Sequence, residues 1–423
     1  MIVKRLLAGL ETADSANRAR GAAALARAYL LEELSDDEAM DAETGLTALL
    51  NDPVIAVRKA MARVLATTPN APPHIIAALA TDHSLVASRV LTHSPLLAED
   101  DLIDALGVAD ATAQVAIALR PYLSGKVAAM IAEQGGREAM IALAVNETAV
   151  LSETSMQRMI ERHGEDGEVR EALLGRSHLP AAIRASIAGR TAEALHAFVI
   201  RTGWLNPQRS DRCTREAHDT AVIEIAAQER GTNATVPLHL AARLRDSSQL
   251  TPSLLLRTLV SGERGLLEAS LAVLSGTDPR RVAGLVRAWS GAGFAALYTK
   301  AGLPPRLLAA FRAALEAQDA TGLVNEAGQS PRLSSLLIER TLQACEASGS
   351  PELRKVNALL HRLRAEAIRS EARAMSLQMI AAAKSERDKE RGNTIANSPK
   401  SAPQIDLKGI EAELDLECTV LAA

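Results

Sequence analysis

The fold is decided by three stretches that align as copies of one unit: NDPVIAVRKAMARVLA (residues 51–66), TDHSLVASRVLTHSP (81–95) and ADATAQVAIALRPYLS (109–124). Each copy has an aspartate at its second position, and Asp52, Asp82 and Asp110 are 30 and then 28 residues apart. Apolar residues at helical spacing follow each aspartate, and weaker copies begin at residues 135 and 165. Helical units of this length bury their apolar sides by stacking on neighbours, so the pattern predicts an α-solenoid.

The first copy shows how one hairpin of this solenoid is expected to form. Asp52 is the predicted N-cap of the first helix, with Pro53 at the first helical position, where a missing N–H costs nothing. The predicted apolar stripe of this helix is Val54, Val57, Met61, Val64 and Leu65. Pro72 and Pro73 are predicted to start the second helix of the hairpin.

The repeats resemble known families. Asp52 and Val57-Arg58 are similar to the Asp…Val-Arg signature of HEAT repeats, and the short period resembles leucine-rich-variant repeats. Residues of about 45–320 also resemble an alphaproteobacterial helical-repeat family of unknown function. The segments that carry this resemblance are HSPLLAEDDL (93–102), IERHGEDGEVREALL (160–174), TPSLLLRTLVSGERGLLEASLAVLSGTDPRRVAGLV (251–286) and GFAALYTKAGLPPRLLAAFRAAL (293–315). The resemblance implies an all-α fold, and it carries over no catalytic residue because the family has no assigned activity.

The chain is predicted to divide into seven parts: an N-terminal cap (1–44), HEAT-like helical repeats (45–195), a junction (196–233), a second helical unit (234–350), a long amphipathic helix (351–391), a disordered linker (392–404) and an acidic amphipathic tail (405–423). In the second unit, Thr251-Pro252 and Asp278-Pro279 are predicted helix starts. The long helix has Leu353, Val356, Leu360 and Leu363 at heptad spacing. Two interpretations of the tail stay open, docking on the Arg-rich junction and a free terminus.

Composition favours helices and disfavours several classes of protein. Hydrophobic residues make up 48% of the chain but aromatic residues only 2%, which favours helix over sheet. The net charge of −4 gives no general reason to expect a nucleic-acid partner. The three Cys form no CxxC pair, and neither a signal peptide nor an apolar run of roughly 20 residues is found. We therefore expect a cytoplasmic protein with no membrane span.

No pattern of catalytic or cofactor-binding residues stands out. The nine His form no His-Glu dipeptide and no HExxH motif, so a metal site is not predicted. Gly291 and Gly293 do not follow a strand, as a phosphate loop requires, and are better explained as helix caps. Cys213 lies between Arg212 and Arg215, but no partner histidine is identifiable for a catalytic thiol. The sequence predicts no enzyme activity, no cofactor and no metal.

Arginine is concentrated around the junction. Between residues 176 and 215 there are seven Arg against two acidic residues. Such a run is often only a solvated face, and the alternative is a surface for an acidic partner. The predicted partner-binding residues are Arg184, Arg190, Arg201, Arg209, Arg212 and Arg215.

The predicted function is a non-catalytic protein-interaction scaffold or regulatory adaptor that binds a partner on the solenoid surface. The first alternative is nucleic-acid binding along the Arg-rich junction. This alternative is weakened by the negative net charge and by the few aromatic residues available to stack on bases. The second alternative is an enzyme of unrecognised type.

Overall fold

A computed structural model describes residues 8–9, 13–31, 34–229, 231, 235–321, 331–347 and 353–394. In these ranges every regular element is a helix, which confirms the predicted all-α class. The chain divides into two units, Met1–Gly328 and Gln329–Ala423, and each is described by itself.

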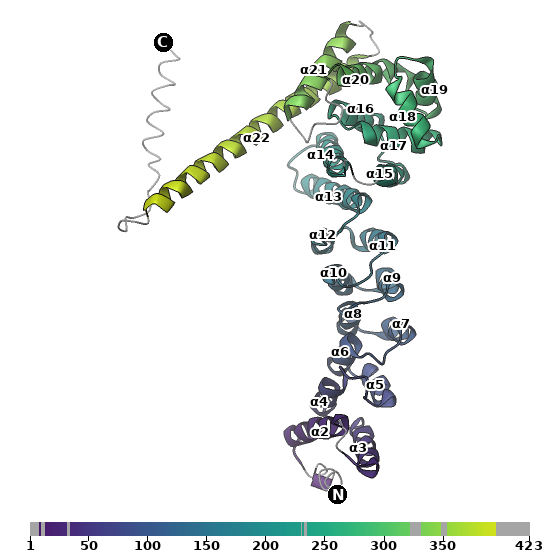
Figure 1. Ribbon diagram of the computed structural model, residues 1–423, viewed down its shortest axis with the longest axis vertical. Helices are drawn as coiled ribbons and strands as arrows, with labels where there is room; N and C mark the ends of the chain where they lie inside the picture. Colours follow the sequence, from purple (N-terminus) through teal and green to yellow (C-terminus); the bar gives the residue numbers. More distant parts are fainter. Residues whose placement is uncertain are drawn as a thin grey trace. The chain divides into compact units, whose positions relative to one another are not determined.

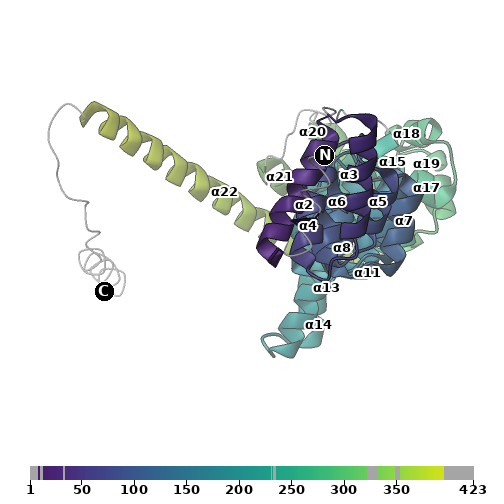
Figure 2. The ribbon, with the colours of Figure 1, turned by 90° about the horizontal axis from the view of Figure 1, so that it is seen from below.

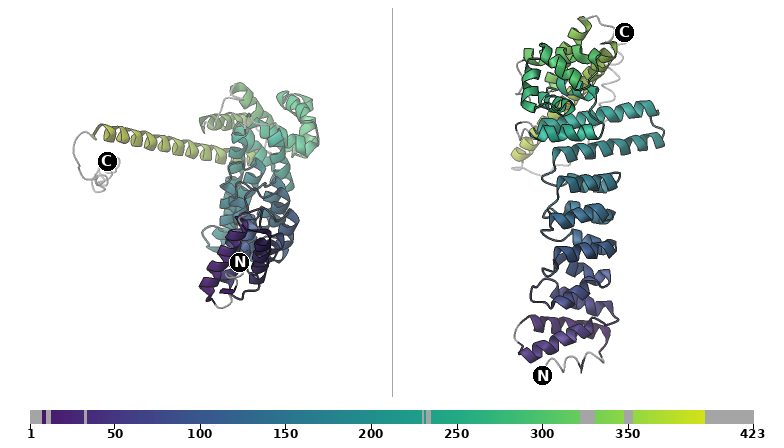
Figure 3. Two further views of the ribbon diagram at one scale, coloured as in Figure 1. Left: turned by 60° about the horizontal axis from the view of Figure 1, so that its bottom comes forward. Right: turned by 90° about the vertical axis from the view of Figure 1, so that its right-hand side faces the viewer.

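The first part of unit 1 is a double row of helices (Figures 1 and 3). One row consists of α2 (Ser15–Leu30), α4 (Ile55–Leu65), α6 (Ser84–His93), α8 (Ala111–Ala118), α10 (Arg137–Val145) and α12 (Gly167–Leu174), each packed on the next. The other row consists of α3 (Asp36–Leu49), α5 (Pro73–Ala80), α7 (Glu99–Val108), α9 (Gly125–Gln134) and α11 (Glu153–His163). One hydrophobic core runs from α2 to α13, so this part is solenoid-like, as predicted.

The start of α4 differs from the prediction. This helix begins at Ile55, and its N-cap is Val54, not Asp52. The Asp52 carboxylate accepts a hydrogen bond from the backbone N–H of Val54 at 2.8 Å, which closes a local turn before the helix. The chain therefore stays non-helical through Pro53. The predicted start of the partner helix is confirmed, because Pro73 is the first residue of α5.

The apolar stripe of α4 is buried most deeply at its centre. Val57, Met61 and Leu65 have no exposed surface. Val54 and Val64 are half-buried and pack against the edge of the core. The predicted stripe is thus confirmed, with Val64 at its margin.

Adjacent helices of the first row are joined at one end by a repeated side-chain bond. We call each junction between two adjacent helices of this row a level. Three levels are joined by an ion pair: Arg18–Asp52, Arg58–Asp82 and Arg137–Asp166, with N–O distances of 2.8, 2.6 and 2.5 Å. Two levels between them have no arginine. Ser84 is hydrogen-bonded to Asp110, and the Gln114 side-chain oxygen accepts from the backbone N–H of Gly136 at 2.9 Å. In every case a helix is tied to the turn that precedes the next helix of its row.

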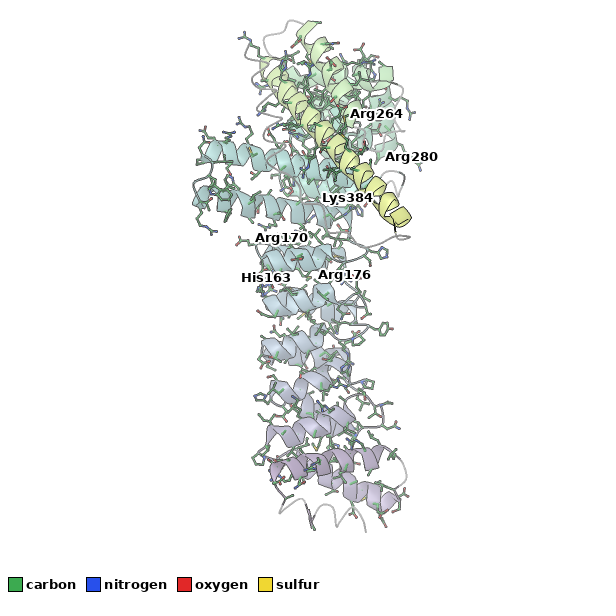
Figure 4. The ribbon with its side chains drawn as sticks, turned by 90° about the vertical axis from the view of Figure 1, so that its left-hand side faces the viewer. His163, Arg170, Arg176, Arg264, Arg280 and Lys384 are labelled. Atoms are coloured by element: carbon green, nitrogen blue, oxygen red, sulfur yellow. The ribbon has the colours of Figure 1, made fainter. Side chains whose placement is uncertain are left out.

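The other end of the same row is joined by donors that bind the carbonyls of the preceding helix. Arg120 donates to the Leu91 carbonyl at 2.9 Å, and Asn146 donates to the Ala118 carbonyl at 2.9 Å. Arg176 donates to the carbonyls of Ala144 and Asn146, both at 3.0 Å. The last carbonyls of a helix have no partner within that helix, so these side chains satisfy them. Arg170 lies near the start of α12 and Arg176 just beyond its end (Figure 4).

Two longer helices follow the double row. α13 (Ala181–Arg201) and α14 (Pro207–Gln228) pack along each other and extend past the preceding helices (Figures 2 and 3). They occupy most of the region predicted as a junction.

A second group of helices completes unit 1. It consists of α15 (Thr235–Asp246), α16 (Pro252–Val260), α17 (Arg264–Ser275), α18 (Pro279–Arg287), α19 (Ala292–Lys300), the 3-10 helix η1 (Pro305–Leu307) and α20 (Leu308–Thr321). The helix starts predicted at Thr251-Pro252 and Asp278-Pro279 are confirmed, since Thr251 and Asp278 are N-caps that accept backbone hydrogen bonds. Phe294, Tyr298 and Phe311 form a buried aromatic cluster in this group.

In unit 2, α21 (Pro331–Ala347) packs against α22 (Arg354–Thr394). This arrangement confirms the predicted long C-terminal helix, and Leu353, Val356, Leu360 and Leu363 are buried. The helix continues three residues into the predicted linker 392–404. Residues 395–423, which hold the rest of that linker and the predicted tail, lie outside the described residues.

Replacement of Val57 by Ala should lower the free energy of unfolding by about 1–3 kcal/mol, because deleted buried methyl groups leave a cavity. Val64→Ala is the matched control on the same helix, and its half-buried position predicts a loss under about 1 kcal/mol. Chemical denaturation, with hydrogen exchange measured in α2, α4 and α6, checks both values. Equal losses for the two variants would contradict the burial pattern.

Acid should weaken the ion pairs between levels. The hydrogen bond from Arg18 lowers the pKa of Asp52. Burial raises the pKa of Asp82, but the hydrogen bonds from Arg58 and from the backbone of His83, together with the nearby positive charge, more than offset it, so this pKa also lies below the ordinary value of 3.8. Such carboxylates stabilise the fold above the pKa of the unfolded chain, and the stabilisation is lost as pH falls through the folded pKa.

The free energy of unfolding should therefore decline as the pH falls below 3.8. Asp82→Asn should be less stable than the wild type at pH 6 and should show a smaller further loss at pH 3. Denaturation curves at the two pH values measure this difference. If the free energy of unfolding fell equally between pH 6 and pH 3 in the variant and the wild type, the Arg58–Asp82 pair would not contribute to the acid sensitivity of the fold.

Candidate interaction site

The structure separates the six arginines predicted to bind a partner into two groups. Arg184 donates to Gln228 at 2.6 Å and pairs with Glu229, so it braces α13 against α14. Arg190 pairs with Glu193 at 3.0 Å on α13. The other four, Arg201, Arg209, Arg212 and Arg215, are exposed near the turn that joins α13 to α14. Their role in binding stays a prediction, and of the six arginines only these four are exposed.

The turn between α13 and α14 is fixed by backbone hydrogen bonds. The N–H of Gly203 donates to the Ile200 carbonyl at 3.1 Å, and the N–H of Trp204 donates to the Val199 carbonyl at 3.2 Å. This pair of bonds is the Schellman closure of a helix, which needs a left-handed residue after the C-cap. Gly203 supplies it with φ of +69°. The next helix then starts at once, with Asn206 as its N-cap and Pro207 as its first residue.

Trp204 is the most exposed large side chain of the turn. It is 71% exposed, and Leu195 and Phe198 beside it on α13 are 51% and 39% exposed. The rings of Trp204 and Phe198 meet edge to face, with centroids 5.5 Å apart. An apolar contact of this kind commonly accompanies a Schellman closure. The indole is thus held in one orientation while most of its surface faces solvent.

One arginine lies over one of these aromatic rings, and three others lie in the first half of α14. The Arg201 guanidinium lies 5.7 Å from the centroid of the Phe198 ring. Arg215 pairs with Asp211. Within the described part of the chain, the guanidinium groups of Arg209 and Arg212 have no hydrogen-bond or ion-pair partner. We call Leu195, Phe198, Arg201, Trp204, Arg209 and Arg212 the hairpin tip.

The chemistry of the hairpin tip suits recognition. Trp and Arg are the residues that most often dominate binding energy at protein interfaces, where they enter well-packed pockets on the partner. A polar pair inside the hairpin, the His196 ring nitrogen and the Ser210 hydroxyl at 2.9 Å, helps to hold the two helices together.

The described residues also lack the features of a metal site and of a membrane span. In the described ranges, His, Cys, Asp and Glu side chains do not gather in threes where an ion could bind. The helices that the structure describes include none with the length and apolar character needed to cross a membrane.

The sequence places Gly203, Trp204 and Pro207 in the predicted junction, where the arginines but not Trp204 were predicted to bind a partner. The local signals were present, because Gly after a helix and Asn-Pro before the next one mark a tight turn between two helices. What the sequence did not reveal is that α13 and α14 are about twice as long as their neighbours. Only this length carries the turn beyond the double row (Figure 2).

Substituting Gly203 with Ala should strain the turn, because the left-handed conformation costs a non-glycine residue roughly 1–2 kcal/mol. Gly284→Ala is the control. Gly284 lies in α18 with open space around it, so the same change should stabilise by about 0.5–1 kcal/mol. Denaturation curves and hydrogen exchange at residues 198–206 report both effects. Unchanged exchange at the turn in Gly203→Ala would contradict the assignment.

Comparison with known proteins places the chain in a family. A family model described as "Uncharacterised protein conserved in bacteria (DUF2336)" matches residues 86–350. Neither the curated proteins nor the solved structures gave a match. The likeness to HEAT repeats and to proteins of one bacterial class stays a prediction. Since the match covers more than half of the sequence, the chain belongs to the uncharacterised bacterial family DUF2336.

Proposed function

We propose that this chain is a non-catalytic protein-interaction scaffold that docks a partner protein through the hairpin tip. The observation that carries the proposal is Trp204, 71% exposed on a turn that backbone hydrogen bonds hold rigid. Keeping a large aromatic side chain in water forgoes the free energy that its burial would provide. A rigid exposed indole also loses little conformational entropy when a partner covers it.

The charges on the hairpin tip suggest the chemistry of the partner. Arg201, Arg209 and Arg212 are exposed, and no ion pair joins them to a carboxylate in the described residues. A surface with a recess for the Trp204 ring and acidic residues around its rim would complement them. The predicted cytoplasmic location fits a scaffold of this kind.

The charged ends of the double row are less suitable for docking. Arg58 and Arg137 are engaged with Asp82 and Asp166, and Arg120 and Arg176 bind helix-terminal carbonyls. A partner that recruited these arginines would break bonds that hold the levels together. This argument favours the hairpin tip over the solenoid surface.

Nucleic-acid binding is the second candidate, because an exposed Trp beside several Arg could stack on bases and contact phosphates. Arg215 already forms an ion pair with Asp211, and the chain carries a net charge of −4. Both features weaken the attraction of a phosphate backbone.

The test compares Trp204→Ala with Tyr122→Ala in the full chain. Tyr122 is an 84% exposed aromatic residue in the double row, so it controls for loss of an exposed ring. Partners are recovered by affinity purification from cells that make the protein and are quantified by mass spectrometry. Loss of Trp204 should weaken recovery of a specific partner at least about tenfold, and loss of Tyr122 should not.

Circular dichroism of both variants checks that the helices remain. Equal recovery with Trp204→Ala and wild type would refute docking through the hairpin tip. Tight binding of single-stranded DNA or RNA, lost in Trp204→Ala and steeply weakened by salt, would instead support the second candidate.

A further inference from the structure

A small polar pocket lies away from the hairpin tip, where α11, α13 and α15 meet. It has a volume of about 170 Å³. Its charged side chains are Arg190 and Glu193 from α13 and Arg243 from α15. The amides of Gln157 and Gln249 also line it. Since a water molecule occupies roughly 30 Å³ in the liquid, the pocket has room for a small ion with some water around it.

Buried polar atoms around this pocket lack partners. The Gln157 Oε1 atom is buried and accepts no hydrogen bond from the described residues. Its amide orientation is fixed, because the Nε2 atom donates to the Glu161 carboxylate at 3.1 Å and a carboxylate only accepts. The Nε2 atom of His218, whose residue is 7% exposed, is likewise buried without a partner. Unsatisfied buried polar groups are uncommon in native proteins and call for an explanation.

Gly189, which lines the pocket, leaves room for Gln249 and His218 beside α13. A Cβ atom at this position would lie 2.9 Å from Gln249 Nε2 and 3.6 Å from His218 Nε2. The absence of a side chain therefore lets both groups approach the pocket wall. Gln249 Oε1 accepts from the Ser247 hydroxyl at 3.1 Å, which turns the donating Nε2 atom toward Gly189.

A second Schellman closure places Gln249. At the end of α15, the N–H of Ser248 donates to the Arg245 carbonyl at 2.9 Å, and the N–H of Gln249 donates to the Leu244 carbonyl at 2.8 Å. Ser248 has φ of +58°, although serine has no special tolerance for that conformation. The turn is held by its bonds and aims Gln249 at α13.

The donors and acceptors of the pocket together define a ligand. The guanidinium of Arg243 has no hydrogen-bond or ion-pair partner among the described residues, and Arg190 keeps N–H groups beyond the one that binds Glu193. Arg243, Arg190 and Gln249 Nε2 are donors that suit an oxyanion. Gln157 Oε1 requires a donor in return. The ligand should therefore be an anion that still carries a proton.

We propose that this pocket binds inorganic phosphate in a form that retains a proton, with its anionic oxygens toward Arg243 and Gln249 and its O–H toward Gln157. Inorganic phosphate keeps at least one proton at neutral pH. Sulfate has none, and a phosphate monoester loses its second proton near pH 6. This preference for a protonated oxyanion separates a formed site from general attraction to arginine.

The experiment titrates inorganic phosphate into the full chain at pH 7 by calorimetry, with sulfate and phosphoserine at matched ionic strength. Phosphate should bind with a millimolar or lower Kd, at least about tenfold tighter than sulfate or phosphoserine. Arg243→Gln should weaken phosphate binding at least tenfold. The control is Arg245→Gln, which changes an exposed arginine of the same helix that pairs with Asp246 and should have no effect.

A second variant keeps the proposal testable if Arg243→Gln unfolds the helix. Gln157→Leu removes the acceptor and the hydrogen bond to Glu161 but keeps the anion-binding donors Arg243 and Gln249, so it should reduce phosphate affinity to that of sulfate and leave sulfate unchanged. Three results would each overturn the proposal. They are no binding at a phosphate concentration ten times a millimolar Kd, equal affinity for sulfate and phosphate, and tighter binding of phosphoserine. Unaltered phosphate binding in Arg243→Gln would overturn it as well.

Discussion

The bond between one helix and the turn ahead of the next helix in its row is the interaction on which the solenoid-like stack depends. Hydrophobic burial brings the helices together, but apolar surfaces alone do not fix their register. The pair Arg58–Asp82 does, because a guanidinium and a carboxylate bind in a defined geometry. Asp166 is the N-cap of α12 and Asp82 directly precedes the N-cap of α6, where a negative charge also offsets the positive end of the helix dipole. Stability and register thus share one set of residues.

The sequence predicted the class of fold because its signals are local. Asp278 is a helix cap as expected, and the apolar spacing of Val57, Met61 and Leu65 marks the buried side of α4. The partner of each aspartate is not a local property. Arg58 precedes Asp82 by 24 residues, and only the stacked structure brings them together. The misplaced start of α4 has a similar origin, since the carboxylate of Asp52 bonds to a turn and to Arg18 in place of capping the helix.

The two candidate sites differ in how far the sequence anticipated them. Each site follows a Schellman closure of its own. The sequence predicts the closure at Gly203, but it does not predict the one at Ser248, because serine gives no signal for a left-handed residue. Arginine density pointed to the region of the hairpin tip, yet it could not separate Arg184, which braces two helices, from Arg201 and Arg212, which face solvent. The pocket combines residues more than 80 positions apart, from Gln157 to Gln249, and no spacing rule connects them.

The bonds along the row are not equal in their response to ionic strength. Dissolved ions screen an exposed ion pair far more than a buried one, and they leave a neutral hydrogen bond almost unaffected. Arg137 and Asp166 are 38% and 26% exposed, whereas Arg58 and Asp82 are each 15% exposed. The level at Gly136 relies on the amide of Gln114. Concentrated salt would therefore loosen the stack between α10 and α12 first, and it would leave the neutral joint between α8 and α10 as the least salt-sensitive point of the row.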